Sequence, residues 1–503
     1  MNHLYDGLLA DKSPDAPFAE IPGDPPRHLT YGGLADASGR YANALLARGV
    51  ARGDRVAVQV KKSIEAVVVY LATVRIGAVF LPLNTAYTVH EVDYFLTNAE
   101  PALFVCDPAR EGEYAALAGR LGVALATLGA AGDGALAAEA AAAPGACDTA
   151  RCGPGDLAAI LYTSGTTGRS KGAMLSHDNL LSNARTLADL WRFTSADVLI
   201  HALPIFHTHG LFVATNIVLT AGAAMVFLPG FTPDAVLAAM PRASALMGVP
   251  TFYTRLLAEP GLTREAAQGM RLFVSGSAPL LAETHLAWRE RTGHAILERY
   301  GMTETNMNTS NPYEGERRAG TVGFPLPDVD VRVVGEDGTP LGAGAIGSIE
   351  VRGPNVFGGY WRMPEKTAEE MRPDGFFITG DVGMFDAEGY LTIVGRSKDL
   401  VISGGFNVYP KEVEEAIDAL PGVLESAVIG VPHPDFGEGV TAVVVPREGA
   451  AVSEAAVLAA LGDQLARYKQ PKRVFVVDEL PRNTMGKVQK AALRERFRAT
   501  YDA

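Results

Sequence analysis

The chain has 503 residues, of which 48% are hydrophobic and 20% are charged, and its formal net charge is −13. These values indicate a folded protein with two or more domains and enough apolar material for a large core. The acidic balance argues against a general nucleic-acid-binding surface and against anionic membranes, although local cations can still hold small anionic ligands. We therefore expect small-molecule partners, with no nucleic acid and no membrane.

Cysteine usage and the N-terminal sequence bear on the compartment. The cysteines Cys106, Cys147 and Cys152 have neither the spacing of a metal site nor the number of a disulfide framework. The N-terminus lacks the basic and apolar regions of a signal peptide, and no window is long and apolar enough for a transmembrane helix. We therefore expect a cytoplasmic protein, and the sequence leaves its oligomeric state open between monomer and homodimer.

The first part of the chain predicts alternating helices and strands. Apolar residues recur at helical spacing over 34–45 and again over 63–76, where Ser63 is a plausible N-cap. Short apolar runs predict strands at 55–60, 78–83 and 102–106. The order strand, helix, strand favours parallel pairing through crossovers, and hence an α/β sheet covered on both faces.

The apolar run at 157–162 predicts a buried strand that leads into a loop rich in hydroxyls and glycines. Inward-turned backbone N–H groups, hydroxyl donors and one lysine suit a polyphosphate. The spacing of Gly165, Gly168 and Lys171 does not match the P-loop of nucleotide hydrolases, and a plain polar surface loop is an equal alternative for this stretch alone. The candidate phosphate ligands are Thr163, Ser164, Gly165, Thr166, Thr167, Gly168 and Lys171.

The pattern of predicted strands and helices changes along the second half of the chain. Alternation continues through short apolar runs at 198–203, 224–228, 245–249 and 271–275. From about residue 323, short β runs broken by Gly and Pro predict a small β subdomain, at 329–334, 347–351, 376–379 and 390–394. Beyond residue 396 the pattern is typical of an α+β domain, with helices at 412–420 and 453–467 and strands at 426–431, 440–445 and 474–477.

These patterns predict an α/β protein with a separate C-terminal domain that follows a hinge. We expect a large N-terminal domain of parallel-rich sheets, helices and a small β subdomain over residues 1–395. A polar, glycine-led hinge would follow at 396–398. A small α+β domain would then occupy residues 399–503.

Several polar stretches directly follow apolar runs, and each has an ordinary alternative. The stretch 300–304 combines an aromatic ring that can stack on a base with a carboxylate that can hold Mg²⁺, but a helix start would explain it too. Asp381 could accept hydrogen bonds from a ribose or simply end a turn. His207 and His209 lack a third metal ligand, so a pocket wall is favoured. Lys487 could be a catalytic cation or a solvated surface charge.

Together and in this order, these stretches resemble the adenylate-forming acyl-CoA synthetase superfamily over essentially the whole chain. The matching stretches are 162–172, 203–207, 275–279, 300–304, 379–381, 395–399, 404–407 and 482–487. Within the superfamily, 201–212, 248–255 and 298–306 look most like the malonyl-CoA synthetases. The resemblance implies that ATP and malonate form malonyl-AMP and pyrophosphate, and that coenzyme A then displaces AMP. Methylmalonate would be used more weakly.

Other enzymes and one non-enzyme remain as alternatives. A synthetase for another small carboxylic or dicarboxylic acid would carry the same motifs. So would an adenylating enzyme that loads a carrier protein. A non-catalytic nucleotide sensor would be expected to lack Lys487 or Glu304, and both are present.

The resemblance also implies a role for each candidate residue. The loop 163–171 would hold the β- and γ-phosphates, Glu304 and Thr163 would serve Mg²⁺, and Asp381 with Arg396 would bind the ribose. Lys398 would be the hinge, and Gly404 and Gly405 would line the channel for coenzyme A. The expected catalytic residues are Lys487, Glu304, Thr303 and His207. The expected lining of the ATP/AMP pocket is Ser275, Gly276, Ser277, Ala278, Glu298, Arg299, Tyr300, Gly301, Met302 and Thr303.

Malonate needs a cation of its own. Its second carboxylate stays ionised at neutral pH, and burying it unpaired would be very costly. We therefore expect an arginine deep in the acid pocket, since its fork can grip a carboxylate with two hydrogen bonds. Arg255 and Arg299 are the candidates, with Ser277 and His207 as further donors. An ordinary salt bridge is the alternative for each arginine.

Overall fold

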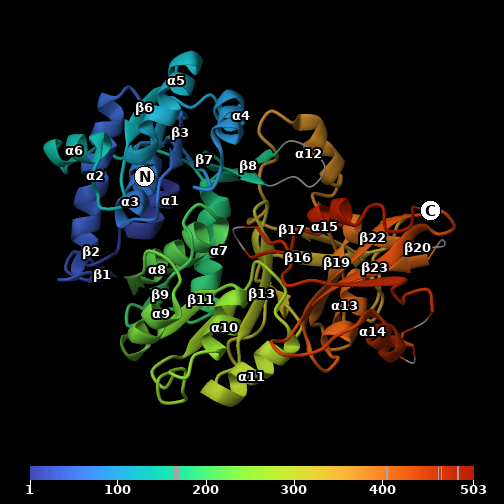
Figure 1. The fold of residues 1–503 in the computed structure, drawn as a ribbon. Helices are drawn as coiled ribbons and strands as arrows, with labels where there is room; N and C mark the ends of the chain where they lie inside the picture. Colours follow the sequence, from blue (N-terminus) through green and yellow to red (C-terminus); the bar gives the residue numbers. More distant parts are fainter. Residues whose placement is uncertain (164–169, 404–405, 463, 466, 484–485, 503) are drawn as a thin grey trace. The chain divides into compact units, whose positions relative to one another are not determined.

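The computed structural model describes residues 1–163, 170–403, 406–462, 464–465, 467–483 and 486–502. By its contacts, the described chain divides into two compact units (Figure 1). Unit 1 comprises Met1–Asp330 with Val351–Gly375, and unit 2 comprises Val331–Glu350 with Phe376–Ala503. The domain boundary and hinge expected at 396–398 stay predictions.

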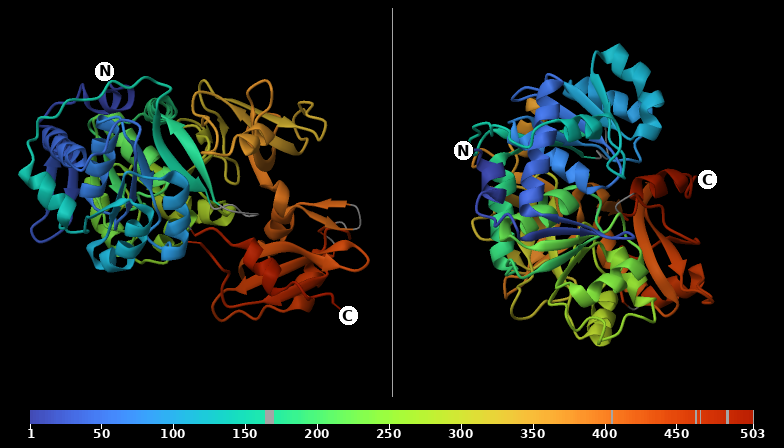
Figure 2. Two further views of the ribbon diagram at one scale, coloured as in Figure 1. Left: turned by 90° about the horizontal axis from the view of Figure 1, so that it is seen from above. Right: turned by 90° about the vertical axis from the view of Figure 1, so that its left-hand side faces the viewer.

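The first sheet of unit 1 has the strand order β6-β5-β3-β4-β7-β8. Strands β6 through β7 pair in parallel, whereas β8 runs antiparallel to β7, and the two form a long ribbon in Figure 2. The expected parallel pairing is confirmed, because the helical crossovers between these strands return the chain to the same edge. The strands are β3 (Arg55–Gln59), β4 (Val79–Pro82), β5 (Leu103–Cys106), β6 (Ala124–Thr127), β7 (Leu157–Thr163) and β8 (Lys171–Ser176).

The second sheet of unit 1 has the order β15-β14-β13-β12-β11-β9-β10-β1-β2. Its central strands are parallel and its two margins are antiparallel. The strands are β1 (Pro17–Ile21), β2 (Arg27–Thr30), β9 (Val198–His201), β10 (Ala224–Phe227), β11 (Ala245–Gly248), β12 (Leu272–Ser275), β13 (Leu297–Met302), β14 (Asn306–Ser310) and β15 (Phe324–Pro325). Polar residues at the carboxyl ends of β9, β12 and β13 therefore share one edge.

Helices flank these sheets on both sides. In Figure 1, α4 and α5 lie on one side of the first sheet, where Phe95 and Tyr114 join its core, and α2, α3 and α6 lie on the other. Ser63 accepts a hydrogen bond from the Ala66 N–H at 3.1 Å, which confirms it as the N-cap of α3. The helices are α1 (His3–Leu9), α2 (Tyr31–Ala47), α3 (Ile64–Arg75), α4 (Val89–Ala99), α5 (Glu111–Leu121), α6 (Ala135–Ala142), α7 (His177–Leu190), α8 (Asn216–Ala221), α9 (Pro233–Ala239), α10 (Pro250–Leu257), α11 (Ala282–Thr292) and α12 (Pro364–Glu370).

Unit 2 holds a small sheet β16-β17-β18-β19 and a second sheet in which β22 and β23 form the centre. Alternate residues of β22 and β23 pack into separate cores on the two faces of the second sheet, as a period of two requires. The strands are β16 (Asp330–Val334), β17 (Gly347–Arg352), β18 (Phe377–Phe385), β19 (Leu391–Arg396), β20 (Val401–Ser403), β21 (Phe406–Val408), β22 (Val423–His433), β23 (Gly437–Pro446) and β24 (Arg473–Val476). The helices are α13 (Pro410–Asp418), α14 (Glu454–Leu461) and α15 (Lys490–Arg496).

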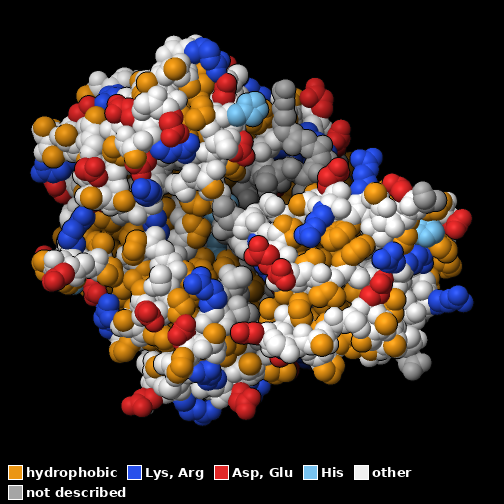
Figure 3. All heavy atoms as spheres, viewed as in Figure 1, with side chains coloured by type: hydrophobic (Ala, Val, Ile, Leu, Met, Phe, Trp, Pro, Cys, Tyr) orange, Lys and Arg blue, Asp and Glu red, His pale blue; other side chains and the backbone are white. Residues whose placement is uncertain are grey.

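One predicted helix is shorter than expected. The helix expected over 453–467 ends at Leu461, because Gly462 follows and glycine is a poor helix former. None of the helices in the described residues has the length and apolarity needed to cross a membrane. Acidic and basic side chains are interspersed on the face drawn in Figure 3.

Candidate active site

The loop predicted to bind polyphosphate joins β7 to β8. Thr163 ends β7 and Lys171 begins β8, and the two residues are partners across the antiparallel pair. The Thr163 hydroxyl donates to the Lys171 carbonyl oxygen at 3.4 Å. The ribbon therefore presents these two side-chain positions next to each other. The loop candidates Ser164, Gly165, Thr166, Thr167 and Gly168 lie outside the described residues.

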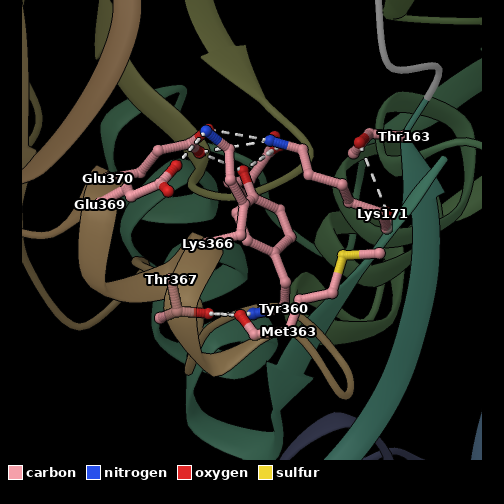
Figure 4. Close-up of polar contacts among 9 residues, drawn as sticks. Thr163, Lys171, Tyr360, Met363, Lys366, Thr367, Glu369 and Glu370 are labelled. Carbon is pink, nitrogen blue, oxygen red and sulfur yellow. Dashed lines mark hydrogen bonds and ion pairs between the residues drawn. The ribbon is translucent and has the colours of Figure 1, made fainter. Parts of the chain in front are cut away.

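Lys171 contacts a carboxylate at the end of α12 (Figure 4). Its Nζ lies 3.0 and 3.3 Å from the two carboxylate oxygens of Glu370 and 4.1 Å from the centre of the Tyr360 ring. Lys366, one turn earlier on α12, lies 3.1 Å from Glu370 Oε1 and 2.8 Å from Glu369 Oε2. Glu370 therefore has two cations against it, as expected for an i, i+4 pair on a helix that meets a second lysine.

The Tyr360 hydroxyl lies between two carboxylates. It is 2.6 Å from Glu370 Oε2 and 3.0 Å from Glu304 Oε1. Burial, together with Glu304 and Glu370, raises the pKa of Tyr360, so this hydroxyl stays protonated and is the donor in each contact. One proton therefore serves both carboxylates.

The charge state of Glu370 follows from its contacts. Burial acts to raise the pKa of Glu370, but the hydrogen bonds from Tyr360, Lys171 and Lys366 outweigh burial, and the pKa lies below its ordinary value. Glu370 is therefore an anion at neutral pH. Its charge balances that of Lys171 before any phosphate arrives.

Glu304 lies in the turn that connects β13 to β14. Tyr300 is buried on β13, while Gly301, Met302 and Thr303 are partly exposed at its end. The alternative of a helix start for this stretch is wrong. The Glu304 side chain is buried, and its contact with Tyr360 is with a neutral hydroxyl. A buried carboxylate next to a neutral donor can still accept a cation.

Arg299 is a buried cation at the carboxyl-terminal edge of the second sheet. Its side chain is 4% exposed, and within the described residues its Nε and Nη2 have no hydrogen-bond partner. Burial lowers the pKa of Arg299 to about 9, so the guanidinium is still charged at neutral pH. A Cβ at Gly276 would overlap the guanidinium, which explains why a residue without a side chain follows β12 here.

Ser277 and His209 face each other beside this arginine. The Ser277 hydroxyl is 3.2 Å from His209 Nδ1, and Ser277 adopts φ = 71°, a left-handed conformation that is uncommon for serine and concentrates at functional sites. Burial and the charge of Arg299 lower the pKa of His209, so its ring is neutral. His209 Nε2 is buried and has no hydrogen-bond partner among the described residues, and the same holds for Ser275 Oγ. These atoms and Arg299 form what we call the acid cluster.

The other predicted acid-pocket residues lie differently. Arg255 is exposed at the last turn of α10, with its guanidinium 5.1 Å from the centre of the Phe231 ring. Of the two arginines predicted for the acid pocket, Arg299 is therefore buried and Arg255 is exposed. His207 is half-buried, with its ring 4.7 Å from that of Phe206. Ala278 is partly exposed.

A buried acid–base pair lies at the edge of the second sheet. Glu298 is buried on β13, with its carboxylate 3.3 Å from His285 Nδ1. Among the described residues, no group of three or more His, Cys, Asp or Glu side chains is arranged to hold a metal ion.

Sequence reasoning missed residues that only the fold brings to the site. His209 was assigned with His207 to a pocket wall but was not named as a ligand of the acid. His201 was missed. Its Nε2 donates to the Gly210 carbonyl at 2.8 Å, while its Nδ1 accepts from Lys62 at 3.0 Å. This fixes the start of the π-helix His209–Thr215, a rare element that often occurs at functional sites.

In unit 2, the predicted ribose ligands are brought together. Asp381 on β18 and Arg396 on β19 are cross-strand partners, and Arg396 Nε lies 2.7 Å from Asp381 Oδ1. Asp381 is buried, whereas Arg396 is partly exposed. Lys398 lies in the short 3₁₀ turn Ser397–Asp399, where burial lowers its pKa. The channel candidates Gly404 and Gly405 lie outside the described residues.

Lys487 is exposed on a tight turn of unit 2. Its N–H donates to Asn483 Oδ1 at 2.9 Å, and its carbonyl accepts from the Asn483 N–H at 2.9 Å. Arg482 donates to the Gly486 carbonyl at 2.6 Å and pairs with Glu425 on β22. These contacts hold the backbone of the turn from both sides, and the Lys487 side chain is exposed.

The comparisons with known proteins cover both units. A family model described as AMP-binding enzyme matches residues 9–361, and one described as AMP-binding enzyme C-terminal domain matches residues 412–487. The crystal structure of ATP-bound MatB from Rhodopseudomonas palustris is similar to the chain with a TM-score of 0.98 and 61% identity, and the match covers 100% of each chain.

Curated relatives extend this similarity. The chain is 38% identical to a feruloyl-CoA synthase of Amycolatopsis sp over 475 residues, which are 93% of this chain and 94% of the relative. It is 35% identical to the mitochondrial malonate–CoA ligase of Mus musculus over 507 residues, and the match covers 93% of this chain and 86% of the relative. The predicted resemblance is confirmed: the chain belongs to the AMP-binding enzyme family of adenylate-forming CoA ligases.

Proposed function

We propose that this protein ligates malonate to coenzyme A in an ATP-dependent reaction. Malonate and ATP give malonyl-AMP and pyrophosphate, and coenzyme A then displaces AMP. The observation that carries the choice of acid is Arg299, a buried cation whose Nε and Nη2 lack partners among the described residues. A second carboxylate would supply these partners. The similarity to a protein named malonate–CoA ligase supports the same substrate.

The charge of Arg299 separates malonate from acids with a neutral tail. Feruloyl-CoA synthase is also similar in sequence, but the aromatic tail of its acid would leave a buried guanidinium unpaired, which is strongly unfavourable. In the acid cluster, the contact between Ser277 and the neutral His209 uses the proton of one of them, so the other would donate a further hydrogen bond to the same carboxylate. His207 and Arg255 stay candidate ligands of the acid. Methylmalonate adds one methyl group, which a pocket rejects only weakly, so we expect slower turnover of it.

The nucleotide is the second substrate. Thr163, Lys171 and the loop between them would bind the β- and γ-phosphates, since an ammonium offsets phosphate charge. Tyr300 would lie against adenine, with residues 275–278 and 298–302 as the pocket lining. Asp381 and Arg396 would bind the ribose, and Gly404 with Gly405 would line the coenzyme A channel.

Magnesium fits the residues at the end of β13. Glu304 is a buried carboxylate in contact with a neutral hydroxyl, and Mg²⁺ prefers one or two carboxylates plus phosphate and water oxygens. Glu304, together with Thr163, would therefore hold the ion. When bound, it would neutralise charge on the phosphates during attack at the α-phosphate.

Lys487 is proposed as the cation of the adenylation step. Attack of a carboxylate on the α-phosphate brings two anions together, so catalysis requires positioning and charge neutralisation. Thr303 would help at the same phosphate. Lys487→Ala should abolish adenylation yet spare thioester formation from preformed malonyl-AMP. Equal loss of both half-reactions would exclude this division of labour.

Domain movement would separate the two half-reactions. Lys398 is the proposed hinge, because a few residues at the ends of elements absorb such changes. Lys398→Pro should therefore impair thioester formation more than adenylation. Cytoplasmic location and a monomeric or homodimeric state stay predictions from the sequence.

The decisive test is pyrophosphate release with malonate, methylmalonate, succinate and acetate, each with and without coenzyme A. Malonate should give the highest kcat/KM, with turnover that requires coenzyme A. A preference for acetate would overturn the assigned acid. Turnover of a carrier protein in place of coenzyme A would overturn the assigned acceptor.

A further inference from the structure

The lysine proposed to bind phosphates is already paired. Lys171 Nζ contacts both oxygens of Glu370, at 3.0 and 3.3 Å, and the side chains of this pair are only 20% and 21% exposed (Figure 4). A partly buried ion pair is screened less by water and salt than a surface pair. Any phosphate that binds Lys171 must therefore displace the Glu370 carboxylate or share the ammonium with it.

Glu370 keeps other partners when Lys171 leaves. Lys366 Nζ lies 3.1 Å from Glu370 Oε1, and the Tyr360 hydroxyl lies 2.6 Å from Glu370 Oε2. Loss of one partner from a buried carboxylate is costly when nothing replaces it, but here a cation and a donor remain. The transfer of Lys171 from Glu370 to a phosphate is thus a balanced exchange.

Tyr360 makes the exchange easier still. Its single proton is divided between Glu370 and Glu304 while Lys171 is in place. When Lys171 leaves, the proton can turn wholly to Glu370, whose charge then has fewer other partners. The tyrosine therefore compensates for the departing lysine.

We propose that Glu370 is a positioning residue that competes with the β- and γ-phosphates for Lys171 and so keeps pyrophosphate exchangeable. This inference rests on the proposed role of Lys171. In the free enzyme Glu370 holds the ammonium at the start of β8, where the phosphates would meet it. After adenylation the same carboxylate recovers Lys171 as pyrophosphate departs.

The test compares two neighbouring glutamates on α12. Glu370→Gln removes the charge but keeps the size of the side chain, and it should lower the inhibition constant of pyrophosphate about 10-fold. The affinity for AMP, which lacks the β- and γ-phosphates, should stay unchanged. Glu369→Gln is the matched control, because Glu369 contacts Lys366 but is 64% exposed and pairs with no other cation in the described residues. Its pyrophosphate inhibition should equal that of the unmodified protein.

A double-mutant cycle separates the exchange from a general charge effect. Lys171→Ala should raise the inhibition constant of pyrophosphate, and in that background Glu370→Gln should have no further effect. If Glu370→Gln tightens pyrophosphate equally with and without Lys171, the effect is long-range repulsion and the proposal is wrong.

Two other outcomes distinguish the inference from its premise. If Lys171→Ala leaves pyrophosphate inhibition unchanged, the proposed phosphate role of Lys171 fails. If Lys171→Ala weakens pyrophosphate while Glu370→Gln leaves it unchanged or weaker, the role of Lys171 stands and the competition is overturned. Direct titration of each variant with pyrophosphate in a calorimeter checks these results independently of turnover.

Discussion

In unit 1, the acid cluster and the residues proposed to bind phosphates differ in how their charges are paired. Around Arg299 the neighbouring groups Ser277 and His209 are neutral, and the described residues leave guanidinium donors unsatisfied. Lys171, by contrast, already has a counter-ion in the protein, because its ammonium contacts both carboxylate oxygens of Glu370.

On the proposed roles of these residues, this difference separates selectivity from turnover. Arg299 is buried, so a second carboxylate would meet a preorganised donor with little reorganisation. At Lys171 the competing carboxylate would weaken the hold on phosphates and so favour release of pyrophosphate. Under these proposals an unsatisfied charge selects the substrate, whereas a satisfied charge lets the product leave.

Replacement of Arg299 tests the first half of this contrast most severely. Arg299→Leu should lower kcat/KM for malonate by about 10³-fold, because loss of a buried charge-assisted contact costs about 2–5 kcal/mol. In the absence of ligand, the same change should raise the free energy of unfolding by about 1–4 kcal/mol, since it replaces a buried charge that has no counter-ion among the described residues with an apolar side chain. Steady-state kinetics and thermal unfolding measure the two effects. A variant that loses stability but keeps its malonate kinetics would reverse the interpretation.

Alkaline pH should weaken the acid cluster specifically. The pKa of Arg299 is lowered to about 9, so the KM for malonate should rise about 10-fold per pH unit above that value as the guanidinium loses its proton. Its folded pKa is below its unfolded pKa, so the unfolded chain binds more protons above pH 9 and this group's contribution to stability rises with pH there. Malonate KM from pH 7.5 to 10 checks this. Arg299→Leu should lack the pH-dependent rise.

Removal of the shared donor tests the paired region. Tyr360→Phe should destabilise the fold by about 1–3 kcal/mol, because Glu304 and Glu370 lose their common hydrogen bond. Chemical denaturation measures the change. In the Glu370→Gln background Tyr360→Phe should cost less, because the hydrogen bond from Tyr360 to position 370 no longer has a charged acceptor. An equal cost in both backgrounds would mean that the hydroxyl does not stabilise the fold through Glu370.

Replacement of Arg255 should have the smallest effect on malonate kinetics. It is exposed and contacts the Phe231 ring, an interaction worth about 0.5–1 kcal/mol at such a site. Arg255→Ala should raise the malonate KM several-fold, with the ATP KM unchanged. If this variant loses more malonate activity than Arg299→Leu, the exposed arginine and not the buried one selects the acid.

Local patterns predicted much of the fold. Apolar runs marked β3, β4, β5 and β7, and the spacing over 63–76 predicted α3 with its cap at Ser63, because these features depend on neighbours within a few residues. The order of the motifs also predicted the family. The end of α14 at Leu461 was not predicted, because the apolar periodicity continues past Gly462, where the helix ends.

The sequence by itself thus determined the parallel α/β architecture and the adenylate-forming chemistry, and it predicted a cation in the acid pocket. Only the tertiary structure distinguished buried Arg299 from exposed Arg255, and only it brought Glu370 to Lys171, since these residues lie far apart along the chain. The physical reason is that burial and charge pairing depend on contacts between residues that are distant in the sequence. Residue type and spacing indicate which interactions a side chain can make, whereas its three-dimensional surroundings decide whether its charge has a partner.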